Sequence, residues 1–224
     1  MRASLFTAAL LAAPLFFSAA ASANPVDYQI DPAHSQIGFS IDRFGFNHVL
    51  GRFDGRIDAH GNQIETPDPA ATWVITGDIM LDQAAPAHSS VHVVVQTAGY
   101  TSGNLARDTV IKGDHWLNVA QYPTMEFRST AVQVTDATHA QVTGDLTLMG
   151  QTHPLTLTVT LNKIGPSPPN QTQAAGFTAT GVVHRSQWGL TVASALIGDD
   201  ITLDIEALGV VQQTTIPVTA SPHN

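Results

Sequence analysis

Most of the chain alternates between apolar and polar residues. Residues 35–41 alternate strictly, so that Ile37, Phe39 and Ile41 share one face. Residues 154–161 likewise place aliphatic side chains on one face and threonines on the other. A period of two belongs to β-strands. About eight to ten such segments with short turns between them predict an antiparallel barrel or a sandwich.

One segment, residues 107–123, has helix signals in place of this alternation. Ser102 or Asn104 can cap a first helix, because a short side-chain oxygen accepts from the free N–H groups of the first turn. We expect Gly113 to end this helix in a left-handed conformation, which glycine adopts at no steric cost. Asp114 then caps a second short turn. A helical insert in a β chain must cover something, and we expect it to cover the barrel.

Three expectations concern the connections between strands. Gly150 and Gln151 form a tight hairpin turn between two strands. Residues 165–176 are rich in proline and polar residues and are expected to form a loop. Asp199 and Asp200 follow a glycine and are expected in a solvated turn.

Charge and cysteine content narrow the class of partner. The 224 residues include 18 acidic residues against 9 lysines and arginines, for a formal net charge of −9. Nucleic acid is excluded as a partner, because binding phosphates requires clustered positive charge. The chain has no cysteine, so its stability must come from the sheet and the core.

The amino-terminal residues follow the pattern of a secretory signal. A positively charged start is followed by an apolar run over residues 5–17 and by small residues that end at Ala23. This run is too short for a membrane span, which needs roughly 20 residues. We therefore predict a cleaved signal over residues 1–23, one barrel domain over 24–212 and a disordered tail over 213–224.

Histidines and acids form no recognised catalytic or metal-binding motif. His88 and His92 lie four residues apart and would share a strand face, but no third ligand accompanies them. The serines lack the Gly-x-Ser-x-Gly turn of many hydrolases. We expect no metal site and no enzymatic activity. An enzyme that acts on a lipid-like or small apolar substrate through a histidine and an acid is the alternative.

Five short patches stand out by their order and spacing. They are Tyr-x-Ile-Asp-x-x-His-Ser at 28–35, Val-x-Gly-Arg-Phe-x-Gly at 49–55, Tyr-Pro-x-x-x-Phe-x-Ser at 122–129, Val-x-Gly-x-Leu-Thr-Leu-x-Gly at 142–150 and Arg-Ser-x-Trp-Gly at 185–189. Together they resemble the YceI-like family of polyisoprenoid-binding proteins. The resemblance implies an all-β, extended lipocalin-like antiparallel barrel in the periplasm, which holds an isoprenoid lipid or the tail of an isoprenoid quinone. It implies no required cofactor.

The resemblance also implies a possible protein partner, a membrane cytochrome of the b561 type, and leaves monomer and homodimer open. The family usually has a histidine where this chain has Arg43. This arginine supplies a fixed charge suited to a phosphate or a quinone oxygen, and a surface role is the alternative. In the insert, Trp116 and Leu117 replace a pair of phenylalanines.

An apolar interior suits a long hydrocarbon, because burial contributes roughly 0.8 kcal/mol per CH₂ group. The expected cavity wall consists of Phe39, Ile41, Phe46, Phe53, Trp116, Leu117, Phe127, Leu146, Leu148 and Trp188. The candidates for contact with a polar head group are His34, Arg43, Arg107 and Asp108. Two alternatives stay open: Arg107 and Asp108 form an internal ion pair that fixes the insert, and the barrel is a structural domain filled by its own side chains.

Overall fold

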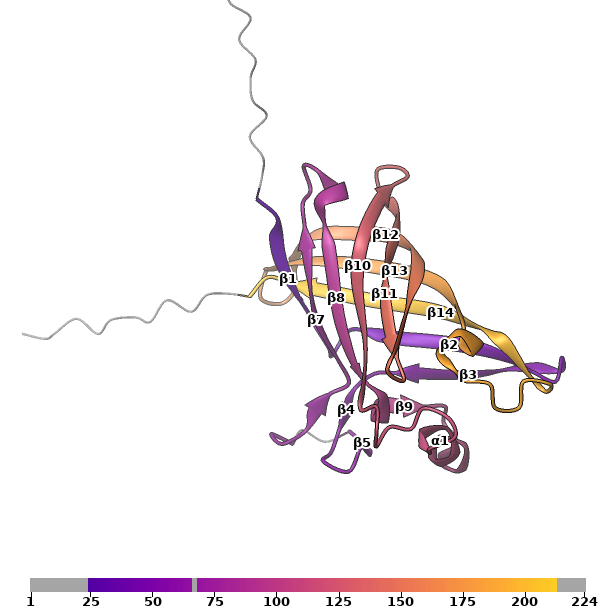
Figure 1. Ribbon diagram of the computed structural model, residues 1–224. Coiled ribbons are helices and arrows are strands. Elements are labelled where there is room, and N and C mark those ends of the chain that lie inside the picture. The colour runs from indigo at the N-terminus through magenta and orange to yellow at the C-terminus, as the bar shows by residue number, and fades with distance from the viewer. Residues whose placement is uncertain (1–23, 66–67, 213–224) are drawn as a thin grey trace, which may run out of the picture.

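A single antiparallel sheet closes on itself to form a barrel. The computed structural model describes residues 24–65 and 68–212, so the expected signal and tail lie outside the described residues. In spatial order the eight barrel strands are β1 (Val26–Ile30), β7 (Ile75–Leu81), β8 (Ser90–Gln96), β10 (Thr124–Val134), β11 (His139–Leu148), β12 (Gln151–Ser167), β13 (Thr172–His184) and β14 (Ile197–Val210). Pairing of β1 with β14 closes the ring (Figure 1). The all-β antiparallel barrel predicted from the sequence is confirmed.

The long strand β14 has two partners along the same edge. Its last residues pair with β1, and its preceding part pairs with β2 (Gln36–Arg43). The chain turns between β1 and β2, where Asp31 N donates to Leu208 O at 2.7 Å and Leu208 N donates to the buried Ser35 Oγ at 3.1 Å. β1 then continues the barrel through β7, whereas β2 continues through β3 (Asn47–Phe53) to β9 (Tyr100–Thr101). Figure 1 shows these two groups of strands running in different directions.

The inner faces of the strands form the core, as the alternation predicts. On β14, Ile201, Leu203 and Ile205 pack against the core cluster. Threonines on the outer faces bond across neighbouring strands, with Thr143 and Thr156 hydroxyl oxygens 2.9 Å apart. These strands therefore have one apolar side and one polar side, which is the pattern of a sheet with one solvated face.

The predicted insert contains one helix, α1 (Leu105–Lys112). Of the two candidate caps, Asn104 is the one used, since its Oδ1 accepts from Arg107 N at 3.0 Å. Gly113 ends the helix in an extended conformation with φ −72°, so the expected left-handed ending is wrong. The second short turn expected after Gly113 is present. Residues 114–117 make a turn, and the left-handed residue that follows is Asn118 with φ 44°.

Three short strands form a separate small sheet: β4 (Arg56–Ile57), β5 (Gln63–Ile64) and β6 (Thr72–Trp73). Three 3-10 turns complete the described structure, at Pro86–His88, Thr97–Gly99 and Arg185–Trp188. Across residues 24–65 and 68–212, no helix combines the length and the apolar character that crossing a bilayer requires.

Three connections between strands differ from the sequence prediction. The central residues of the β11–β12 hairpin are Met149 and Gly150, with φ 50° and 72°, in place of Gly150 and Gln151. Residues 165–176 are mostly strand, because backbone pairing extends β12 and β13 to Ser167 and Thr172 without apolar alternation. Asp199 and Asp200 lie within β14, where the register with β2 shifts.

The junction of β1 with β14 depends on a close contact at Gly209. A methyl group there would lie 2.8 Å from Tyr28 Cβ, and Tyr28 is completely buried. We expect Gly209→Ala to lower the free energy of unfolding by about 1–3 kcal/mol, the usual cost of overpacking. Urea unfolding followed by circular dichroism measures the change. Gly176→Ala is the matched control, since nothing lies within 4 Å of its added methyl group. Equal stability of the two variants would contradict the prediction.

Candidate functional site

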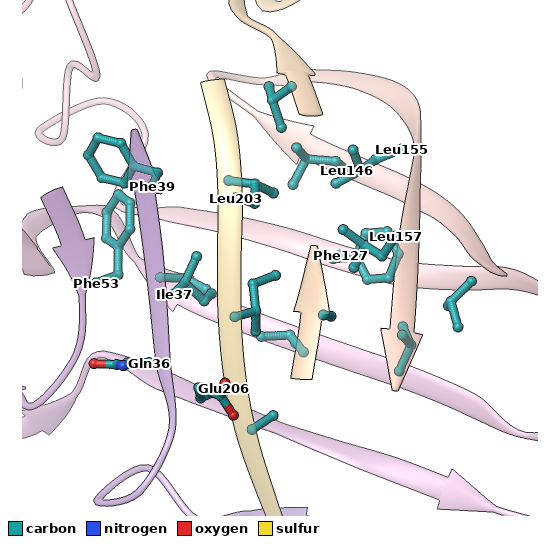
Figure 2. Close-up of a pocket in the computed structure, with 18 of the residues that line it drawn as sticks. Gln36, Ile37, Phe39, Phe53, Phe127, Leu146, Leu155, Leu157, Leu203 and Glu206 are labelled. Carbon is teal, nitrogen blue, oxygen red and sulfur yellow. The ribbon is translucent and has the colours of Figure 1, made fainter. Parts of the chain in front are cut away.

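A cavity of about 1130 Å³ occupies the barrel. The inward residues of all eight barrel strands line it, together with residues of β2, β3 and α1. Figure 2 shows Phe39 and Phe53 on one side and Leu146, Leu155 and Leu157 on the other. Pockets for small molecules usually measure about 300–1,000 Å³. The side chains of this barrel therefore leave a large space empty, which contradicts the alternative of a filled barrel.

Eight of the ten residues expected on the wall line this cavity. They are Phe39, Ile41, Phe53, Trp116, Leu117, Phe127, Leu146 and Leu148. The later strands contribute more residues to the wall than the sequence alone predicted. The wall also includes Leu155, Leu157, Val159, Phe177, Ile201, Leu203 and Ile205. The alternation of apolar and polar residues could have identified these wall residues, because residues two positions apart lie on the same face of a strand.

The expected position of Phe46 on the wall is wrong, since its side chain is 89% exposed. Phe44 and Gly45 form a tight turn with φ 59° and 69°, and Phe46 N donates to Arg43 O at 3.1 Å. Strand β3 resumes with Val49 facing inward. A residue an odd number of positions away, such as Phe46, then belongs to the outer face.

Trp188 is also misplaced by the sequence prediction, although it is buried, with 1% exposure. It lies in the 3-10 turn after β13, outside the cavity lining. Its indole Nε1 donates to Leu146 O at 3.1 Å, and its ring meets His153 edge-on at 5.1 Å between centroids. Trp188 therefore supports the β11–β12 hairpin and does not face the cavity.

Two glycines allow aromatic rings to lie flat against the wall. A methyl group on Gly51 would collide with the Phe39 ring, and one on Gly144 would lie 2.5 Å from Phe127 Cζ. Gly51 pairs with Phe39 across β2 and β3. Because glycine has no side chain, each ring occupies the place of the missing Cβ and leaves the centre of the barrel open.

An aromatic group lies where β9 meets the barrel. The Phe39 ring centroid is 5.6 Å from that of Tyr100 and 6.0 Å from that of Phe53. Burial raises the pKa of the Tyr100 hydroxyl, so this group stays neutral. The wall near β9 is therefore uncharged despite the tyrosine.

Arg107 and Asp108 do not form a direct ion pair. Both converge on Ser102: Arg107 Nε donates to Ser102 Oγ at 2.7 Å, and Ser102 N donates to Asp108 Oδ1 at 3.0 Å. Asp108 is buried and lies outside the cavity lining, whereas Arg107 lines the cavity. These contacts hold the corner between β9 and α1. The role predicted for Asp108 in contacting a head group does not match this placement.

Of the other two polar candidates, one lies at the cavity and one does not. Arg43 lines it, with its guanidinium 4.4 Å above the Phe44 ring. The His34 side chain is 70% exposed and outside the cavity, where its Nδ1 lies 2.8 Å from Asp31 Oδ2. His34 therefore belongs to the turn between β1 and β2, and its predicted contact with a head group does not match this position.

Arg185 is a cavity residue that sequence reasoning missed. It is 2% exposed, lines the cavity, and has its guanidinium 6.0 Å from the centroid of the Trp116 ring. Burial lowers its pKa, while the charge of Asp199 opposes that shift. The Arg-Ser-x-Trp-Gly patch is the sequence feature that could have identified this residue, because the patch follows β13 at the end of the barrel wall.

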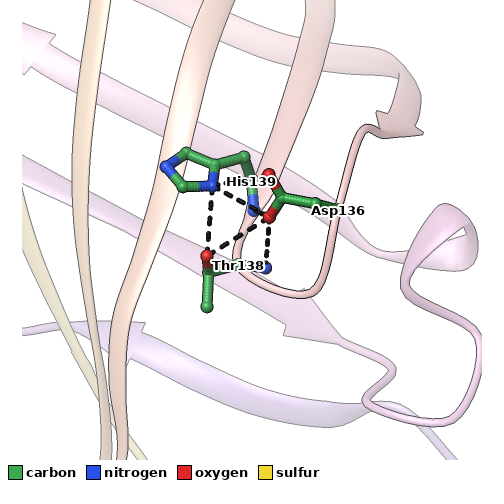
Figure 3. A network of polar contacts seen from close by, with 3 residues as sticks. All are labelled: Asp136, Thr138 and His139. Carbon is green, nitrogen blue, oxygen red and sulfur yellow. Dashed lines mark hydrogen bonds and ion pairs between the residues drawn. The ribbon is translucent and has the colours of Figure 1, made fainter.

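At another part of the cavity edge, the β10–β11 turn presents Asp136, Thr138 and His139 (Figure 3). Thr138 N donates to Asp136 Oδ1 at 2.9 Å, and His139 Nδ1 lies 2.9 Å from the same oxygen. The hydrogen bond from Thr138 and then that from His139 lower the pKa of Asp136 to about 2. The carboxylate is therefore ionised at neutral pH and serves the turn.

The enzyme alternative requires a histidine and an acid at the cavity. Within the described residues, the pair with both members on the lining is His139 with Asp136, and both are exposed. A further group, His184 with Asp199 and Asp200, brings ligand atoms within 4.8 Å of one another on the exposed surface. Its members bond to one another or to Ser186. Neither group lies at the apolar centre of the cavity.

Comparison with known proteins identifies the family. The model of the YceI-like domain matches residues 28–208. The chain belongs to the YceI-like domain family. A UPF0312 protein of Pseudomonas putida (strain W619) is 33% identical over 209 residues, which cover 92% of this chain and 98% of the relative. A UPF0312 protein of Vibrio cholerae serotype O1 is 31% identical over 189 residues, covering 84% and 89%.

Solved structures of other bacterial proteins share the fold. BcnA of Burkholderia cenocepacia superposes with a TM-score of 0.65 at 17% identity, covering 80% of this chain and 98% of BcnA. A polyisoprenoid binding domain from Saccharophagus degradans superposes with a TM-score of 0.51 at 14% identity, covering 84% and 99%. At these identities the likeness shows the fold alone.

Gly51 gives a test of the cavity wall, because the three atoms nearest to an added methyl group all belong to the Phe39 ring. We expect Gly51→Ala to displace the Phe39 ring into the cavity and weaken binding of the apolar fluorophore N-phenyl-1-naphthylamine about tenfold, equal to about 1.4 kcal/mol. Adding Phe39→Leu should restore binding, because leucine has no ring to displace. Fluorescence titration measures both. If the double variant binds as weakly as Gly51→Ala, the loss arises from the β2–β3 backbone and not from the ring.

Proposed function

We propose that this protein is a carrier that holds a long apolar lipid inside the barrel, of the isoprenoid or isoprenoid-quinone type. The observation that carries the proposal is the cavity of about 1130 Å³, which inward aliphatic and aromatic side chains line on every one of the eight barrel strands. The side chains do not fill a cavity of this size, and an apolar ligand can supply the contact atoms that its lining lacks. The Saccharophagus degradans neighbour, described as a polyisoprenoid binding domain, supports the choice of lipid.

The geometry favours a single extended chain over a compact molecule. The cavity lining includes Thr138 of the β10–β11 turn and Val110 of α1, two elements that lie at opposite ends of the barrel (Figure 1). Each buried CH₂ group contributes roughly 0.8 kcal/mol. A long hydrocarbon therefore binds tightly with few polar contacts. The cavity distinguishes ligands mainly by the length of their hydrocarbon chain.

The proposal includes export to the periplasm. Its support is the amino-terminal pattern of a positive start, an apolar run and small residues that end at Ala23. Expression of the full chain followed by cell fractionation and amino-terminal sequencing tests this part. A soluble periplasmic protein that begins at Asn24 would support it, and an intact amino terminus in the cytoplasm would exclude it.

The ligand is tested by purifying the protein without detergent, extracting it with organic solvent and analysing the extract by mass spectrometry. We expect about one long-chain isoprenoid per protein. Protein that is empty after such purification, and that fails to take up an added isoprenoid, would exclude the carrier. Chemical change of an added lipid would favour the enzyme alternative.

Adjacent residues of β14 provide a matched pair of variants. Leu203 faces the cavity, and Thr202 is exposed on the outer face. We expect Leu203→Glu to abolish lipid retention, because a buried carboxylate beside a hydrocarbon loses its hydration. Thr202→Glu should retain the lipid. Mass spectrometry gives the ratio of lipid to protein, and circular dichroism confirms that both variants fold. Equal retention would contradict the assignment of the strand faces.

A further inference from the structure

Two segments meet at one end of the molecule and expose apolar side chains there. They are residues 43–51, from the end of β2 into β3, and residues 189–197, which lead into β14. Phe44 N donates to Leu196 O at 2.8 Å, so the two segments are joined at this point. In Figure 1 the ends of β2 and β3 and the start of β14 project together from the barrel. Four exposed side chains form the apolar tip of this projection: Phe44, Phe46, Val192 and Leu196.

The side chains of the apolar tip serve neither the core nor the turn that carries them. Five of the nine large apolar side chains that are exposed in the described residues lie in these two segments, and Phe46 is 89% exposed. Phe44 has φ 59° in a tight turn, a position where glycine, asparagine and aspartate are usual. A contiguous exposed apolar patch is typical of an interaction surface.

The cavity reaches the surface beside the apolar tip. Arg43 and Ile197, each next to a tip residue in the sequence, line the cavity and pair in register. Val110 of α1 also lines it and is 57% exposed. Arg185 connects the two sides, because its guanidinium lies 6.0 Å from the Trp116 ring centroid, after α1, and donates to Ile197 O at 2.9 Å. A mouth of the cavity therefore opens between the apolar tip and α1.

The charge around this mouth suits an anionic surface. The chain has a formal net charge of −9, yet residues 43–51 and 189–197 contain one arginine, Arg43, and no acidic residue. On α1, Arg107 lines the cavity, whereas the carboxylate of Asp108 is buried. Anionic head groups attract basic residues and repel acidic ones. This end can therefore approach an anionic bilayer, although the protein as a whole is acidic.

The opposite end of the cavity lacks this combination. Asp136 and His139 of the β10–β11 turn line the cavity there, and the pKa of Asp136 is lowered to about 2, so its carboxylate is ionised at neutral pH. Of the described exposed apolar residues, Val134 is the one at this rim. An ionised carboxylate opposes contact with an anionic surface. The two ends are therefore not equivalent, and the apolar tip is the better suited to a bilayer.

We propose that the apolar tip inserts into the interface of a bilayer that contains anionic lipid, so that the mouth beside α1 faces the membrane. The inference rests on the proposed carrier function and adds where that carrier takes up and releases its ligand. Binding at a membrane surface combines burial of apolar side chains with attraction of basic residues to anionic head groups. A long hydrocarbon then passes between bilayer and barrel without exposing its CH₂ groups to water, which is unfavourable.

Flotation with vesicles tests the docking surface. The full chain, purified without detergent, is mixed with vesicles of phosphatidylethanolamine and phosphatidylglycerol, and the bound fraction gives a partition coefficient. We expect Phe46→Ser to lower this coefficient at least about tenfold, because serine removes the ring that enters the interface. Phe46→Trp should keep it. Val182→Ser is the matched control, since Val182 is exposed on the outer face of β13. All variants share one amino terminus, so differences between them report on the tip.

The lipid composition and the salt concentration give a second measurement on the same protein. Replacing phosphatidylglycerol by phosphatidylcholine should weaken binding, because the vesicle then lacks negative charge. Raising the sodium chloride concentration should weaken it too, since salt screens the exposed Arg43. Binding that is insensitive to both changes would contradict the proposed part played by the basic residues.

Transfer of a lipid links the surface to the carrier. Vesicles that contain radiolabelled geranylgeraniol are incubated with the protein, and the label recovered with vesicle-free protein is followed over time. We expect Phe46→Ser to take up the label about tenfold more slowly than Val182→Ser, in line with its weaker docking. Both variants should bind N-phenyl-1-naphthylamine in solution as the unchanged protein does, because Phe46 and Val182 lie outside the cavity lining. Circular dichroism confirms that they fold.

The outcomes separate the docking surface from the carrier on which it rests. Protein that takes up geranylgeraniol but does not float, or Phe46→Ser that floats as well as Val182→Ser, would overturn the inference and leave the carrier in place. Self-association that Phe46→Ser abolishes, without vesicle binding, would assign the tip to a second copy of the chain and overturn the inference too. Failure of the unchanged protein to bind either probe would overturn the carrier and the inference together.

Discussion

The sharing of β14 between two strands determines the shape of this protein. β1 and β2 follow each other in the chain and pair with successive parts of one edge. On its other side each of these two strands pairs with a different strand, β1 with β7 and β2 with β3. The buried Ser35 hydroxyl and the Asp31 amide hold the branch point to Leu208. The space between the two branches becomes part of the cavity, and α1 covers it from outside the ring.

The cavity combines two environments that require different side chains. Along the barrel, glycines such as Gly51 and Gly144 keep aromatic rings flat, so the wall is smooth and apolar. At the end under α1, the wall can no longer be built from strand faces alone. Arg185 fills that corner and donates to the carbonyl oxygens of Leu190, Val192, Ile197 and Gly198. A structural need for hydrogen-bond donors has thereby placed a cation beside an apolar space.

The sequence predicts what depends on periodicity and misses what depends on turns. The alternation around Phe39 and Leu146 places both on the wall, where the structure has them. The predicted position of Phe46 is wrong because a two-residue turn decides which face of the next strand points inward. A shift of one position exchanges the inner and outer faces. The loop predicted at residues 165–176 is wrong because backbone pairing alone extends β12 and β13 through proline and polar residues. Arg185 belongs to a corner that long-range contacts create, and no local pattern reports such contacts.

The closure of β1 on β14 also sets the order in which the protein can be completed. The two strands are the first and the last in the described chain, so their pairing spans almost its whole length. Contacts between such distant segments form slowly, and synthesis releases the amino-terminal strands first. Until β14 has emerged, the apolar inner faces of the earlier strands remain open to water and the sheet has two free edges. The enclosed interior therefore arises in one late step, when the final strand joins both β13 and β1.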